Sequence, residues 1–113
     1  MVFLKTQCFR CFLIIQKKHG FKLLLVMDGD RNETIAAIDN NRSIDTSSLV
    51  INGIVREEAY KRNIQFLDLQ PVIEEDYRNN RTPFHFRNDN HWNQYMHKLV
   101  AREIFGVLPS DWL

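Results

Sequence analysis

Apolar side chains recur along the chain in two patterns, one typical of helices and one typical of buried strands. Residues 3–18 carry them at approximately helical spacing and end in basic residues before Gly20, which predicts a helix with a glycine stop. The run FKLLLVM at 21–27 is apolar without alternation, so it predicts a strand that is buried on both faces. The run IQFLDL at 64–69, with Asp68 near its end, predicts a second strand.

Helical patterns fill the stretch between the two predicted strands. A turn at 28–32 is followed by a short helix at 33–41. A longer helix is expected at 48–63, capped by Thr46 or Ser47. The residues expected on its inner side are Leu49, Ile51, Ile54, Val55 and Tyr60.

Two more helices are expected after the second strand. Pro71 suits the first position of a short helix at 71–79. A polar loop at 80–89 then leads to a last helix at 93–105. Its core face is expected to consist of Tyr95, Leu99, Val100 and Ile104.

Strands that alternate with helices predict an α/β fold with a parallel sheet and helices on both faces. With 113 residues the chain suits one domain. A parallel sheet of only two strands is a poor core on its own. We therefore expect residues 1–113 to form a single, incomplete domain, a partial three-layer α/β/α sandwich whose N-terminal strands are missing.

Composition and charge exclude several classes of protein. The chain is 44% hydrophobic and 26% charged, which is an ordinary globular balance and argues against disorder. The formal net charge of +1 gives no basic surface for nucleic acid. The longest apolar run, at 23–27, is too short to span a membrane, and no small-residue cleavage site marks a signal peptide. The compartment is not set by composition.

Asp89 and His91 are the first candidate for chemistry. Residues two apart in extended backbone point the same way, so the carboxylate can accept a hydrogen bond from one ring nitrogen. The other nitrogen is then free to act as a general base. On these two residues alone, a turn or cap aspartate beside a surface histidine remains the commoner interpretation.

The sequence around this pair resembles a known family. NDNHWNQYMHKLVAREIF at 88–105 is similar to the C-terminal block of SGNH/GDSL-type hydrolases, including acetyltransferase-like relatives that act on exopolysaccharides. The resemblance implies a flavodoxin-like three-layer fold and a Ser-His-Asp triad in which Asp89 is the acid and His91 the base. Trp92 and Asn93 match the residues that follow and are candidates for substrate binding. His97 matches a second histidine of the block, while Met96 stands where a glycine is common.

The nucleophile that the resemblance requires has no counterpart in the sequence. In the family it lies in a Gly-Asp-Ser type turn, and no Gly-x-Ser occurs here. MDGDRN at 27–32 continues with arginine where the serine would stand. The serines of the chain, none of them in an expected strand-to-helix elbow, are Ser43, Ser47, Ser48 and Ser110.

The resemblance thus implies the C-terminal portion of a serine esterase or O-acyltransferase that acts on an acylated carbohydrate or a small ester. A missing N-terminal segment or a partner chain would supply the serine, and we expect this chain alone to be inactive. No cofactor is expected. The alternative is a non-catalytic α/β fragment or protein-interaction module.

Two further motifs carry weaker hypotheses. Cys8 and Cys11 could be a redox pair or half of a zinc site completed by His85 and His91, but their apolar helical surroundings favour core packing. We expect no metal site there. Trp92 could line a sugar site, although packing against the last helix is favoured.

The acidic turn at 28–33 could bind a cation through Asp28, Asp30 and Glu33. It lacks the remaining spacing of a calcium loop. A turn at a strand end, with Glu33 near a helix start, is the favoured interpretation.

Overall fold

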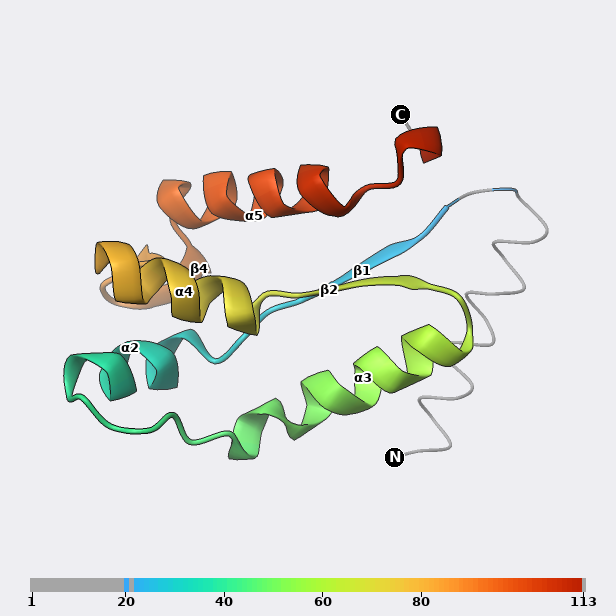
Figure 1. Ribbon diagram of the computed structural model, residues 1–113. Coiled ribbons are helices and arrows are strands. Elements are labelled where there is room, and N and C mark those ends of the chain that lie inside the picture. The colour runs from blue at the N-terminus through green and yellow to red at the C-terminus, as the bar shows by residue number, and fades with distance from the viewer. Residues whose placement is uncertain (1–19, 21, 113) are drawn as a thin grey trace.

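The computed structural model describes Gly20 and residues 22–112, and it shows a mixed α/β fold with a small parallel sheet (Figure 1). The sheet pairs β1, Leu24–Met27, with β2, Gln65–Asp68, so that Leu24 lies opposite Gln65 and Met27 opposite Asp68. The two predicted strands and their parallel pairing are confirmed, with shorter bounds than expected. The helix expected at 3–18 lies outside the described residues.

Helices lie on both faces of this sheet (Figure 1). Successive strand residues point to opposite faces. Leu25 and Phe66 therefore pack with Ala59 of α3, Val50–Lys61, on one face. The opposite face packs against α5, Gln94–Val107, through the cluster that contains Leu24, Leu67, Leu99 and Val100.

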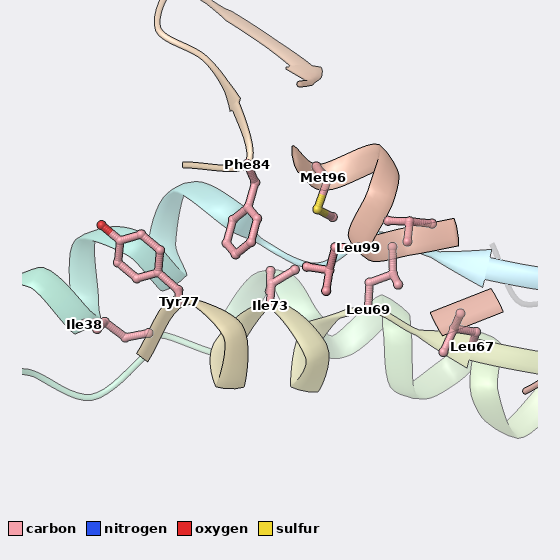
Figure 2. Packing of buried hydrophobic residues seen from close by; sticks show 9 residues of the cluster. Ile38, Leu67, Leu69, Ile73, Tyr77, Phe84, Met96 and Leu99 are labelled. Atoms are coloured by element: carbon pink, nitrogen blue, oxygen red, sulfur yellow. The ribbon is translucent and has the colours of Figure 1, made fainter. Parts of the chain in front are cut away.

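The larger core cluster forms where α4, Gln70–Asn80, meets α5 (Figure 2). Ile73 of α4, Met96 of α5 and Phe84 between them are fully buried. Phe84 comes from the segment that was expected to be a polar loop. The rings of Tyr77 and Tyr95 flank Phe84 at centroid distances of 6.0 and 6.3 Å. Phe84 therefore anchors an otherwise largely exposed segment in the core.

The same segment contains a short antiparallel hairpin. β3, His85–Phe86, pairs with β4, Asp89–Trp92, and His85 lies opposite Trp92. The prediction of an irregular loop at 80–89 is thus wrong for its second half. After β4, Asn93 caps α5, because its Oδ1 accepts a hydrogen bond from the backbone N–H of Met96 at 2.9 Å.

The remaining helices differ from expectation at their ends. α2, Arg31–Asp39, begins early because Asp30 caps it and accepts from the backbone N–H of Glu33 at 3.0 Å. A 3₁₀ turn, Ser47–Leu49, precedes α3, and neither Thr46 nor Ser47 makes the expected capping bond.

The inner face of α3 also differs from the prediction. Tyr60 was expected on it but is 84% exposed, and Ile51 is exposed as well. Asn52 and Ala59 are buried instead. A second 3₁₀ turn, Ser110–Trp112, follows α5. Within the described part of the chain, no helix is both long and apolar enough to cross a membrane.

Candidate functional site

Asp89 and His91 contact each other in β4. The ring Nδ1 of His91 is hydrogen-bonded to Asp89 Oδ1, and the backbone N–H of His91 donates to the same oxygen at 2.8 Å. The backbone N–H bond, followed by the bond to the ring, lowers the pKa of the Asp89 carboxyl below its usual range. The two side chains therefore lie together, as their two-residue spacing predicted, although they belong to a strand instead of a loop.

The pair is open to solvent. The side chain of His91 is 87% exposed and that of Asp89 is 52% exposed. An ion pair this exposed contributes little to folding stability. The arrangement has a chemical consequence, because a carboxylate on Nδ1 leaves Nε2 available to take a proton.

β4 lies beside the carboxyl end of β1. Asp28 follows β1, and its Oδ2 accepts a hydrogen bond from Trp92 Nε1 at 3.0 Å and one from Arg31 Nε at 3.1 Å. Arg31 also donates through Nη2 to the backbone carbonyl of Asn90 at 2.8 Å. These bonds hold the candidate pair at the edge of the sheet where ligands bind in open α/β folds.

A shallow pocket of about 320 Å³ opens next to His91. Its lining residues are Arg31, Asn90, His91, Trp92 and His97. The rings of Trp92 and His97 meet edge to face at a centroid distance of 5.4 Å. Trp92 is half-buried and also packs against the core, so it both supports α5 and lines the pocket.

Asn93, the other candidate for substrate binding, does not line this pocket. Its Oδ1 caps α5, and its Nδ2 donates to the backbone carbonyl of Pro83 at 2.9 Å. Both polar atoms of the side chain are therefore engaged in holding the hairpin to the start of α5.

Sequence reasoning missed the residues that support β4. Asp28 was considered only as a possible cation ligand, and Arg31 and Asn90 were not singled out. His85 was considered only as a possible zinc ligand, and its burial was not foreseen: its Nδ1 is buried and has no hydrogen-bond partner in the described structure. Burial, and then the charge of Arg31, lower the pKa of His85, while the charge of Asp28 partly opposes them. The position of Asp28 at a strand end was the only available signal.

The carboxylates of the acidic turn do not converge. Asp28 bonds Trp92 and Arg31, and Asp30 caps α2. Glu33 binds Arg42 at 2.7 and 2.9 Å, and mainly this pairing lowers the pKa of Glu33 to about 2. Among the described residues, no group of three metal-ligating side chains forms. Cys8 and Cys11, with the zinc and redox hypotheses attached to them, lie outside the described residues.

Two of the serine hydroxyls are hydrogen-bonded to carboxylates and not to His91. Ser47 Oγ donates to Asp45, and Ser48 Oγ donates to Asp30 Oδ2 at 2.6 Å. In the part of the chain that the structure describes, no serine hydroxyl is hydrogen-bonded to His91.

Comparison of the chain with protein-family models, with curated proteins and with solved structures finds no match. The residues at 88–105 and the geometry around them therefore carry the functional assignment.

Proposed function

We propose that this chain carries the acid–base part of an SGNH-type serine esterase or O-acyltransferase. The observation that carries the proposal is the bond from His91 Nδ1 to Asp89 Oδ1 within the sequence Asp-x-His-Trp-Asn. In this role Asp89 fixes the tautomer of His91 and stabilises the imidazolium that forms during the reaction.

The proposed reaction is acyl transfer through a serine ester. His91 Nε2 takes the proton of a serine hydroxyl as the oxygen attacks the ester carbonyl, and it returns this proton to the departing alcohol. Water or an acceptor hydroxyl then attacks the acyl-enzyme with the help of the same nitrogen. The substrate class is an acylated carbohydrate or a small ester, and the pocket beside Trp92 and His97 is the place where it would lie.

The serine would come from a missing N-terminal segment or from a partner chain. We propose that its strand joins the sheet formed by β1 and β2, completing a three-layer α/β/α sandwich. Two observations support this arrangement: the sheet has only two strands of four residues each in the described structure, and helices pack on both of its faces.

The test begins with the coding DNA upstream of Met1. If an in-frame segment with a Gly-Asp-Ser turn is present, the extended protein should hydrolyse short acyl esters and should react with serine-directed phosphonates. His91→Ala should then lower kcat by about a million-fold, as expected when one member of a triad is removed. Asp111→Asn, which alters an exposed ion pair with Lys22, is the matched control. An extended protein that keeps its turnover without His91 would refute the proposal.

A second candidate is a non-catalytic module that binds another protein. Large apolar side chains at Val50, Phe86 and Phe105 are exposed in the described structure. Exposed apolar groups of this kind can mark partner surfaces. This candidate is favoured if the extended protein, or a neighbouring chain co-expressed with it, fails to react with the phosphonate.

A further inference from the structure

The residues on both sides of His91 are tied to the segment that follows β1. Before it, the carbonyl of Asn90 accepts from Arg31 Nη2 at 2.8 Å, and the Asn90 side chain accepts from Asn32 Nδ2 at 3.4 Å. After it, Trp92 Nε1 donates to Asp28 Oδ2 at 3.0 Å. His91 itself makes none of these bonds, so the segment after β1 holds the backbone on either side of the imidazole.

This arrangement follows from the alternation of side chains along β4. Asn90 and Trp92 are two residues apart and contact the segment after β1. Asp89 and His91, also two apart, contact each other and face solvent. Holding the side chains on one face of β4 in place therefore also sets the direction of the side chains on its other face.

The hairpin needs this external support. β3 has only two residues, and the pairing of β3 with β4 is irregular between His85 and Phe86. A two-stranded hairpin is marginally stable in water when nothing packs against it. The bonds to Asp28 and from Arg31 involve charged groups, which makes them stronger than neutral hydrogen bonds. The Arg31 side chain is only 14% exposed, so solvent screens its bonds less than it screens the Asp89–His91 pair.

The segment that carries Asp28 is itself held rigidly against α4. Asp28 Oδ1 accepts from the backbone N–H of Gly29 at 2.8 Å, and the backbone N–H of Asp30 donates to Gln70 Oε1 at 2.9 Å. Gly29 lies so close to α4 that a Cβ on it would be 2.9 Å from the Cα of Gln70. The support of β4 thus begins in a segment that packs closely against α4.

We propose that Asp28 and Arg31 are positioning residues, which hold β4 so that Asp89 orients the His91 ring and its Nε2 faces the pocket. The effect of these two residues on catalysis rests on the proposed function. The structural part of the inference concerns only the orientation of one imidazole and can be measured in the chain as given, without any esterase activity.

The test is nuclear magnetic resonance of the 113-residue chain and its Asp28→Asn variant. The variant keeps the size of the side chain but removes the charge that accepts from both Trp92 and Arg31. Above the pH at which an imidazole titrates, we expect the Nδ1–H tautomer of His91 to predominate in the parent and to give way to a mixture in the variant. Exchange of the Trp92 indole N–H should become about tenfold faster, the factor for losing a hydrogen bond to a charged group. The indole of Trp112 serves as the internal reference.

Two further variants keep the test decisive if Asp28→Asn unfolds the chain. Trp92→Phe removes the indole donor while keeping an aromatic ring against the core, and it should shift the His91 tautomer in the same direction. Asp111→Asn, the same change in an exposed ion pair, should leave both tautomer and exchange unchanged.

The proposal is overturned if either variant, Asp28→Asn or Trp92→Phe, folds and its His91 has the same tautomer as in the parent. In an active extended enzyme, Asp28→Asn should lower kcat with little change in KM. An unchanged His91 tautomer in a folded variant refutes the positioning role. Esterase activity that does not need His91 refutes the proposed function, so the two failures are distinguishable.

Discussion

The two imidazoles of the β3–β4 hairpin are placed in opposite ways. His91 is exposed and its Nδ1 is bonded to Asp89, whereas the Nδ1 of His85 is buried and has no partner in the described structure. Burial and the charge of Arg31 lower the pKa of His85, which favours the neutral form of that ring. One histidine is therefore a candidate base, and the other lies opposite Trp92 in the hairpin.

The lowered pKa of His85 predicts how stability depends on pH. Below the ordinary value of 6.5 the unfolded chain binds a proton at this ring that the folded chain rejects, so the free energy of unfolding falls as the pH drops below 6.5. His85→Asn should remove the part of this fall in the free energy of unfolding that comes from His85. Urea denaturation of parent and variant at about pH 7.5 and 5.5 measures it, and these values lie above the range in which carboxylates titrate.

An equal fall in the parent and in His85→Asn would show that the His85 ring, whose Nδ1 is buried, does not contribute to the pH dependence.

Residue contacts could be predicted from the sequence only where they are local. Asp89 and His91 are two residues apart, and extended backbone places their side chains on the same side of the strand, which made their contact predictable. Trp92 is 64 residues from Asp28, and Asn90 is 59 from Arg31. No periodicity in the sequence links such positions, so the support of the site became visible only in the fold.

The turn between β1 and α2 depends on close contact with α4. A Cβ on Gly29 would be 2.3 Å from Gln70 Oε1 and 2.8 Å from Ile73 Cδ1, besides its approach to the α4 backbone. Gly29→Ala should therefore lower the free energy of unfolding by about 1–3 kcal/mol, since backbone and core must move to admit the methyl group. Chemical denaturation measures this change.

Gly53 is the matched control for that substitution. It lies in α3 and a Cβ there would meet nothing within 4 Å. Gly53→Ala should stabilise the protein by about 0.5–1 kcal/mol, because alanine loses less backbone freedom in a helix. A Gly29→Ala protein as stable as Gly53→Ala would mean that the turn is not packed as tightly as described.

Helices and strands could be predicted from the sequence where their apolar patterns are strong. β1, β2 and α5 were predicted because burial on a sheet or a helix face leaves a clear pattern in the sequence. The β3–β4 hairpin was missed because its strands are short and mostly polar, and charged partners far along the chain hold it in place. Phe84 was misjudged for the same reason, because Phe84 and Phe86 form too short a pattern to show that Phe84 alone is buried.

The fold brings all recognised parts of the candidate site to one end of the sheet. Asp28 follows β1, and β4 lies against it with Asp89 and His91 facing outward. The sheet that supports them has two strands in the described structure, with helices on both faces (Figure 1). The arrangement supplies an imidazole bonded to a carboxylate and an adjoining pocket. Under the proposed function, the group still required is a nucleophile within reach of Nε2.

This leads to the expectation that the 113-residue chain shows no serine-type esterase turnover. The hydroxyls of Ser47 and Ser48 are bonded to Asp45 and Asp30, and neither is bonded to His91. A base without a nucleophile to activate loses about a million-fold in rate relative to a complete triad. Hydrolysis of short acyl esters by the purified chain should therefore stay at the level of its His91→Ala variant and should be insensitive to serine-directed phosphonates. Phosphonate-sensitive turnover that a single serine-to-alanine change at 43, 47, 48 or 110 removes would show instead that the chain builds a complete site by a different route.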